Sequence, residues 1–442
     1  MNNMNYKEYF SEAEKLGLDP YQISFSLSEE TDVEVFNDEV ESQEIGSTQG
    51  ISAIGILDGK KGSFSTDCID RETPELLARQ VYESARYGKE ARKEDYFAGG
   101  LKYHRSLFSK KNVVPATLKE LRDFALDYSK RVSSYSPLIK KTNVSLCMVK
   151  AKSEKVNSLG LKCSDTGLYF SCSVEIIAEN DSHEPRSNYK SFWSMTSLED
   201  LKSKSEEVIP ELVSGCIDFF GSMAEASKKY KIVFSPSCTA TLLSYYLSQL
   251  NAKKVQKHLS AFEGKMNTKI ASANITLKNM PFLKKPGNSI YDADGYPTKE
   301  FTFIEKGVLK DYFYSVESAN VDHRKSNGCA SGDGNGSPIL VSMKPGRLSQ
   351  DGLFHKMKDG LYIKSLEGLN SGINGQTLDF SLPCSGYVIK DGVKGKAFSM
   401  MVVAGNVKDV FENVISVGND ISERFGRYIP SILIRPLMVS GD

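Results

Sequence analysis

Alternation of apolar and polar positions predicts strands in the first half of the chain. Residues 167–180, GLYFSCSVEIIAEN, show it best, because every second position is apolar, as on a half-buried strand. A helix predicted at 5–17 precedes strands within 21–66 and a helix at 73–88. A helix predicted at 115–134 likewise precedes strands at 142–180 and a helix that begins near Ser197. The order of strands and then a helix occurs twice, which suggests an internal duplication.

The second half of the chain is predicted to contain a helix at 239–250, followed mainly by strands and turns. Hairpin turns are expected at 305–307 and 390–392, where charged residues and glycine interrupt apolar runs. Strands and helices are segregated, which favours an α+β fold over a parallel α/β sheet. We predict two domains, an N-terminal β-meander-plus-helix domain of residues 1–228 and a C-terminal strand-rich domain of residues 229–442.

The helix predicted at 239–250, TATLLSYYLSQL, has two different faces. Its apolar positions recur at i, i+3, i+4 and i+7, the spacing of one helical stripe; they are Leu243, Tyr246, Leu247 and Leu250. Thr239 or Thr241 could cap its start. The polar positions are Ser244, Tyr245, Ser248 and Gln249, so the function of this second face decides what the helix does.

The composition indicates a globular protein without a nucleic-acid partner. The 442 residues are 40% hydrophobic and 25% charged, and the 56 basic residues balance the 56 acidic ones. A nucleic-acid binder usually carries a basic excess, so we expect no nucleic-acid binding.

No segment of the sequence indicates a membrane span or a secretory signal. The N-terminal MNNMNYKEYFSEAEKLGL lacks a basic stretch followed by an apolar core, and no apolar run approaches eighteen residues. The eight cysteines form no CxxC pair. We therefore expect a cytoplasmic protein with free thiols and no membrane contact.

The histidines give no metal-binding pattern. None has a partner three to five residues away, the spacing that places two ligands on one helix face. A role on the surface or in the core is the simpler interpretation for each; they are His104, His183, His258, His323 and His355.

Three further motifs have an ordinary structural interpretation. NSIYDADGYPTKE resembles a calcium loop but has Ile290 and Phe301 where ligands would stand, so a turn is predicted. The glycine-rich 327–338, NGCASGDGNGSP, has no phosphate-loop lysine; it either lies against another backbone or a bound peptide, or is a flexible surface loop. Cys384 would need a base to act as a nucleophile, and the sequence identifies none.

Several stretches of the second half resemble the TldD/PmbA family, specifically its PmbA or TldE branch, once described as modulators of DNA gyrase. They are YDADGYPTKEFTFIEKGVLKDYFYSVESA, GINGQTLDFSLPCSGYVIKDG, VVAGNVKDVFENVISVGND and YIPSILI. In the first half, GISAIGILDGKKGSFSTDCID is similar to a further family segment. The run that ends in VGND is the most specific of these.

The resemblance implies a metallopeptidase assembly in which this chain carries no metal. The TldD branch has H-E-x-x-x-H on a helix and a later cysteine, which together resemble a zinc site. Here Ser244, Tyr245 and Gln249 stand at the His, Glu and His positions, and no cysteine follows Asp420. These side chains cannot replace imidazoles as zinc ligands, so we predict no catalytic residue and no cofactor, with zinc only in a TldD-type partner.

The function that the resemblance favours is therefore that of a non-catalytic subunit of a heterodimer that degrades unfolded or precursor peptides. Candidate peptide-channel or partner-surface residues are Tyr245, Gln249, Asp379, Ser385 and Asn419. The alternatives are a self-sufficient hydrolase with an unforeseen site such as Cys384, a protein-binding regulator linked to DNA gyrase, and a scaffold or homodimer without peptide contact.

Overall fold

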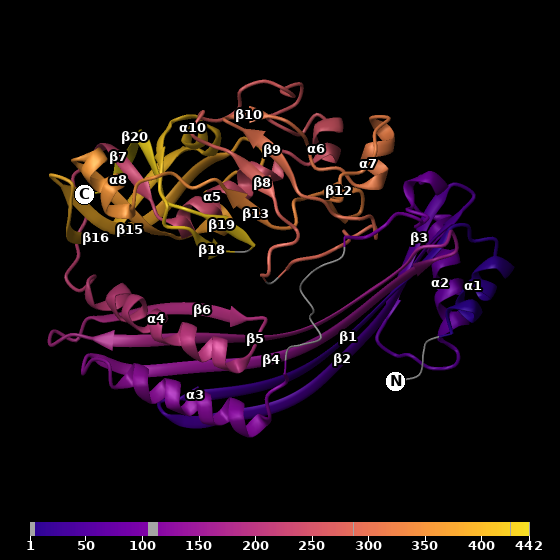
Figure 1. Cartoon of the computed structure of the whole chain (residues 1–442), viewed down its shortest axis with the longest axis horizontal. Coiled ribbons are helices and arrows are strands. Elements are labelled where there is room, and N and C mark those ends of the chain that lie inside the picture. The colour runs from indigo at the N-terminus through magenta and orange to yellow at the C-terminus, as the bar shows by residue number, and fades with distance from the viewer. Residues whose placement is uncertain (1–4, 105–113, 286, 425, 442) are drawn as a thin grey trace. The chain divides into compact units, whose positions relative to one another are not determined.

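The chain forms two compact units in a computed structural model (Figure 1). The structure describes residues 5–104, 114–285, 287–424 and 426–441. The first unit comprises the residues up to Ile217 together with Asp294–Pro297, and the second comprises Asp218–Ala293 and the residues from Thr298 onward. The predicted boundary after residue 228 falls within the second unit.

One antiparallel sheet of six strands forms the centre of the first unit. Its spatial order is β3-β2-β1-β4-β5-β6, so the two halves of the sheet meet at the pair β1–β4. The strands are β1 Tyr21–Phe36, β2 Glu39–Leu57, β3 Lys60–Thr66, β4 Ile139–Asn157, β5 Lys162–Glu179 and β6 Pro185–Ser194.

The helices of the first unit complete a repeated order of elements. A helix, three strands and a second helix occur twice, as α1-β1-β2-β3-α2 and as α3-β4-β5-β6-α4. The predicted repetition is thus present, including the predicted opening helices α1 and α3, with the additional strand β6. The helices are α1 Tyr6–Lys15, α2 Thr73–Arg86, the short 3-10 helix η1 Lys93–Asp95, α3 Leu118–Ser133 and α4 Leu198–Ile217.

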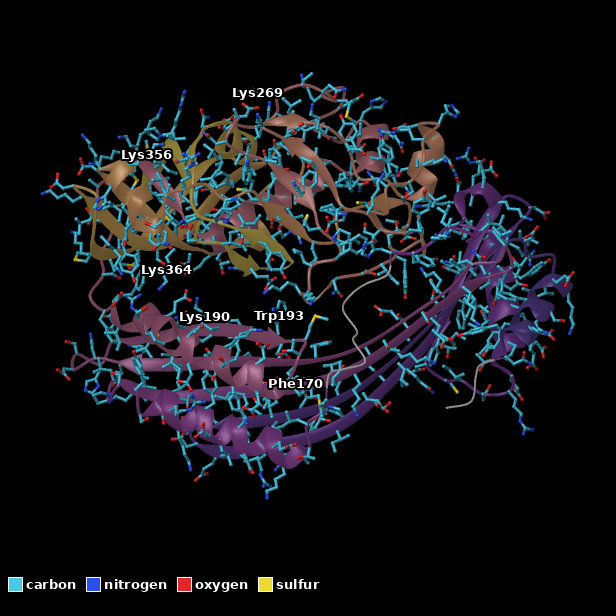
Figure 2. The ribbon with its side chains drawn as sticks, in the orientation of Figure 1. Phe170, Lys190, Trp193, Lys269, Lys356 and Lys364 are labelled. Atoms are coloured by element: carbon cyan, nitrogen blue, oxygen red, sulfur yellow. The ribbon has the colours of Figure 1, made fainter. Side chains whose placement is uncertain are left out.

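Apolar side chains gather on one face of this sheet because strand residues alternate in direction. Across the register, Val33 pairs with Leu146, Leu146 with Cys172 and Cys172 with Phe192, and all four are buried. Figure 2 labels Phe170 and Trp193 on the neighbouring strands β5 and β6. Phe170 is fully buried with the apolar row, whereas Trp193 follows Phe192 and lies on the opposite, less buried face.

The second unit contains a sheet that closes on itself. Its order is β16-β15-β14-β7-β20-β17, and β16 pairs additionally with β20. The pair β7–β14 is parallel, and the others are antiparallel. The strands are β7 Lys228–Phe234, β14 Gly360–Leu366, β15 Asp379–Lys390, β16 Val393–Asn406, β17 Val414–Val417 and β20 Ile432–Ser440.

A second, mixed sheet of shorter strands has the order β10-β9-β8-β13-β19-β18, and a small hairpin, β11–β12, stands apart from it. Both predicted hairpin turns are present, at β9–β10 and at β15–β16. The strands are β8 Leu277–Asn279, β9 Phe301–Glu305, β10 Val308–Leu309, β11 Ala330–Gly332, β12 Asn335–Gly336, β13 Val341–Met343, β18 Ser422–Arg424 and β19 Arg427–Ile429.

Helix α5 lies between the two larger sheets of the second unit. It contacts β7 and β14 of the closed sheet and β18 and β19 of the mixed sheet (Figure 1). The helices are α5 Pro236–Ser248, α6 Ala252–Gln256, α7 Val316–Val321, α8 Gln350–Met357, α9 Leu369–Gly372 and α10 Val407–Glu412. The predicted α+β class is confirmed, because helices and strands are largely segregated.

Within the described residues, no helix is both long enough and apolar enough to cross a membrane.

Candidate functional site

Helix α5 begins earlier than the sequence predicted. Ser235 is the N-cap, and its hydroxyl accepts a hydrogen bond of 3.2 Å from the backbone N–H of Cys238. Pro236 occupies the first helical turn, where its missing N–H costs nothing. The predicted cap at Thr239 or Thr241 is wrong, because both hydroxyls lie inside the helix and donate to carbonyls one turn back.

The predicted apolar stripe of α5 is confirmed. Leu243, Tyr246, Leu247 and Leu250 are all buried in the core of the second unit. The Tyr246 ring lies 4.8 Å from that of Phe262 and 4.9 Å from that of Phe411, and its hydroxyl donates to the Ile270 carbonyl over 2.6 Å. This stripe fixes the rotation of the helix and hence the direction of its polar residues.

The three polar positions where the resemblance places His, Glu and His are bonded to backbone instead. The Ser244 hydroxyl donates to the Ala240 carbonyl of the same helix over 2.9 Å. The Tyr245 hydroxyl donates to the carbonyl of Leu369 in α9 over 3.2 Å. Each side chain therefore has a structural partner within the second unit.

Gln249 is the most constrained of the three. Its side chain is fully buried, and its amide nitrogen donates to the Gly375 carbonyl over 2.8 Å. Its amide oxygen accepts from the Ala261 N–H over 3.0 Å. One side chain thus joins the end of α5 to two separate loops.

These residues do not fit a zinc ion. The donor set at 244, 245 and 249 is a hydroxyl, a phenol and an amide, none of which supplies the imidazole or thiolate that zinc prefers. Within the described part of the chain, no three His, Cys, Asp or Glu side chains are grouped so that they could hold a metal ion. His183 and His258 instead form exposed pairs with Glu179 and Glu263.

Asp379 stands at the start of β15, beside the segment that Tyr245 and Gln249 contact. It is exposed, and its carboxylate accepts a hydrogen bond of 2.9 Å from the side chain of Asn406. Hydrogen bonds from Asn406 and Thr377 lower the pKa of Asp379 below its usual value. Its backbone carbonyl accepts from Asn374, next to Gly375, so the structure brings the neighbourhoods of three predicted residues together.

Ser385 and Asn419 have different surroundings. The Ser385 hydroxyl lies 2.5 Å from that of Ser365 on the adjacent strand β14. Asn419 is exposed, and its backbone N–H donates to the Leu348 carbonyl over 2.8 Å. Whether any of the five predicted residues contacts a peptide or a partner stays a prediction.

The motifs with an ordinary interpretation largely behave as expected. Residues 293–295 form a turn, and the buried carboxylate of Asp292 accepts the Ala330 N–H over 2.9 Å. The glycine-rich 327–338 is mostly buried and contains the hairpin β11–β12. It lies against another backbone, since a Cβ on Gly336 would be 2.0 Å from the Phe313 carbonyl oxygen, so the flexible-loop alternative is wrong.

The sequence did not reveal a cavity on a neighbouring face of α5. It has a volume of about 210 Å³, and its lining includes Ser244, Lys254 and Arg427. Lys254 and Arg427 lie far apart in the sequence and belong to no motif, so only the fold brings them together.

The two matched domains place the chain among metallopeptidase-like proteins. Family models of the PmbA/TldA metallopeptidase central domain and C-terminal domain match residues 111–214 and 227–441. The chain belongs to the PmbA/TldD family, which confirms the resemblance drawn from its motifs.

Similar proteins are known from bacteria and archaea. The metalloprotease PmbA homolog of Buchnera aphidicola is 27% identical over 287 residues, which cover 64% of this chain and 62% of that protein. A candidate modulator of a DNA gyrase from Thermotoga maritima has a TM-score of 0.87 at 24% identity and covers 98% of this chain and 99% of its own. TldE from Thermococcus kodakarensis has a TM-score of 0.85 at 19% identity, with 98% and 99% covered. The two structural likenesses establish the fold alone.

Proposed function

We propose that this chain is a non-catalytic, PmbA/TldE-type subunit that pairs with a TldD-type metallopeptidase in the cytoplasm. The observation that carries the proposal is the bonding of Ser244, Tyr245 and Gln249 to backbone groups. In a metal-binding helix the polar atoms at these positions must be free for the metal site, whereas here they hold α5 in place. The zinc of the assembly then belongs to the partner subunit.

The role of the chain in the pair is to shape the peptide channel. A peptide can add as a strand to the edge of a sheet, where main-chain groups supply the affinity. Strand β18 stands at the edge of the mixed sheet and directly follows the VGND motif. Asp379 and Asn419, which are exposed, remain candidates for contact with the peptide or the partner.

Reconstitution with a TldD-type subunit tests this proposal. The two purified chains are mixed, their association is measured by analytical ultracentrifugation, and hydrolysis of an unstructured peptide is followed by mass spectrometry. We expect a heterodimer, faster hydrolysis than with the partner alone, and zinc in proportion to the partner by elemental analysis. A partner that is fully active alone and does not bind this chain would refute the proposal.

The alternative of a cysteine hydrolase is not supported by the surroundings of Cys384. The thiol is 3% exposed, and burial raises its pKa to about 12. A thiol with this pKa stays protonated near neutral pH and is a poor nucleophile. The gyrase alternative is supported by the descriptions of the similar proteins from Thermotoga maritima and Bacteroides thetaiotaomicron, and by no feature described above.

A further inference from the structure

The cavity beside α5 contains two positive charges. It is bounded by α5, α6, the glycine-rich loop 327–338 and β19, and Lys254 and Arg427 are both part of its lining. All of these elements belong to the second unit, so the site is complete within it.

Lys254 is a partly buried cation without an acidic partner. Burial lowers the pKa of its ammonium group, which donates a hydrogen bond of 3.4 Å to the Ser248 hydroxyl. The preceding residue, Lys253, pairs instead with Glu317 at 2.7 Å. In the described part of the chain no carboxylate lies within ion-pair distance of Lys254. A desolvated charge of this kind is costly until an anion compensates it.

Arg427 adds a second desolvated cation. Burial lowers the pKa of its guanidinium group, and the charge of Glu423 acts in the opposite direction. A guanidinium presents paired N–H donors that match the two oxygens of a carboxylate. With Lys254 on another wall of the cavity, the net charge of the lining is positive.

The remaining walls limit what the cavity can hold. The Asn251 side chain is occupied, since its amide nitrogen donates to Asn335 and its oxygen accepts from the N–H groups of Lys253 and Gly336. Ser337 also lines the cavity, and its hydroxyl can donate a hydrogen bond. Leu247 supplies an apolar wall. The combination suits an oxyanion attached to a small aliphatic group.

We propose that this cavity binds a carboxylate, and that the carboxylate is the C-terminus of a short peptide. Lys254 and Arg427 would pair with the two oxygens, Ser337 would donate a hydrogen bond, and a small terminal side chain would pack on Leu247. The choice of a peptide rests on the proposed function, whereas the oxyanion site rests on the cavity alone.

Titration calorimetry with the full chain alone tests the site, so its outcome is separate from heterodimer formation. The probes are trialanine, trialanine amide, acetate and inorganic phosphate. We expect trialanine to bind at least about tenfold more tightly than its amide, since about 1.4 kcal/mol of charge pairing corresponds to tenfold. Lys254→Gln should weaken trialanine binding by a similar factor. Lys257→Gln is the matched control, because Lys257 is exposed, one position beyond α6, and outside the cavity.

A second measurement uses the unaltered chain, in case Lys254→Gln perturbs folding. Acetylation by a succinimide ester at pH 8, read by mass spectrometry, should modify Lys254 readily, and trialanine should slow that modification without slowing the modification of Lys257. If acetate or phosphate protects Lys254 as well as trialanine does, the site binds free oxyanions and the peptide assignment is wrong. If no probe binds or protects, or both lysine variants behave alike, the site itself is refuted.

Discussion

Gln249 occupies a position that binds metal in the family's catalytic pattern but has a structural role in this chain. In the metal-binding pattern of the family this position would carry a histidine, whereas here a fully buried amide joins the end of α5 to Gly375 and Ala261. An amide has both a donor and an acceptor, so it can satisfy a carbonyl and an N–H at once. A zinc-binding histidine could not make both of these contacts.

We expect Gln249→Ala to lower the free energy of unfolding by about 1–3 kcal/mol, because it leaves two backbone groups without their partner. Urea unfolding followed by circular dichroism measures the change. Asn419→Ala is the control, since Asn419 is exposed, and a surface change of this kind shifts stability by less than about 0.5 kcal/mol. Equal effects of the two variants would contradict the structural role of Gln249.

At the level of single residues, the sequence predicted what α5 carries but not what those residues contact. The replacement of His, Glu and His by Ser244, Tyr245 and Gln249 could be predicted from a motif on one helix. Their partners at 369–375 are distant in the sequence, and no local pattern specifies which carbonyl a side chain reaches. The same limit hid Lys254 and Arg427, whose proximity depends on how α6 and β19 pack.

The hairpin β11–β12 shows why an element can require glycine without using its flexibility. Gly336 lies so close to the Phe313 carbonyl that a methyl group would overlap it. Glycine here allows two backbones to pack closely. The run of glycines in 327–338 predicted this packing only as one of two alternatives.

Gly336→Ala is expected to lower the free energy of unfolding by about 1–3 kcal/mol, the usual cost of overpacking. Gly46→Ala in β2 is a matched control, because a Cβ there would meet nothing within 4 Å. Thermal and urea unfolding of the two variants check this. A Gly336→Ala variant as stable as Gly46→Ala would show that the loop relaxes freely.

Longer elements were predicted better than short ones. Strand alternation located β4 and β5, and helical periodicity located α2, α3 and α5. Strand β6 was missed, although Phe192 and Ser194 alternate with less buried residues. The turn between β1 and β2 was missed too, although Asn37 and Asp38 both adopt the left-handed conformation that Asn and Asp tolerate. Strands of two or three residues, such as β10 and β18, carry too few positions for a period to show.

Buried thiols in the second unit, and a half-buried thiol in the first, make the molecule sensitive to alkali. Burial raises the pKa of Cys147, Cys238 and Cys384 from 9.0 to about 12. Above pH 9 the unfolded chain loses these protons while the folded chain retains them. The stabilisation is therefore complete below pH 9 and is lost as the pH rises toward 12.

We expect the free energy of unfolding to fall between pH 9 and 12 by up to about 1.4 kcal/mol per pH unit for each such thiol. Urea unfolding in the presence of a reducing agent, at intervals from pH 7.5 to 11, measures the slope. Cys384→Ala should make the slope shallower. Cys68→Ala is the control, because Cys68 is exposed in the folded protein; a slope equally altered by both substitutions would contradict the assignment.

The central pair β1–β4 has a consequence for how the first unit can form. Each repeat contributes one long strand, of 16 and 19 residues, whose partner on one side comes only from the other repeat. A chain that ends before β4 would leave the edge of β1 open, and long open edges recruit other chains. We therefore expect that neither repeat folds by itself. The pairing must await distant segments, which makes it a slow step in folding and makes chains that end before β4 prone to aggregation.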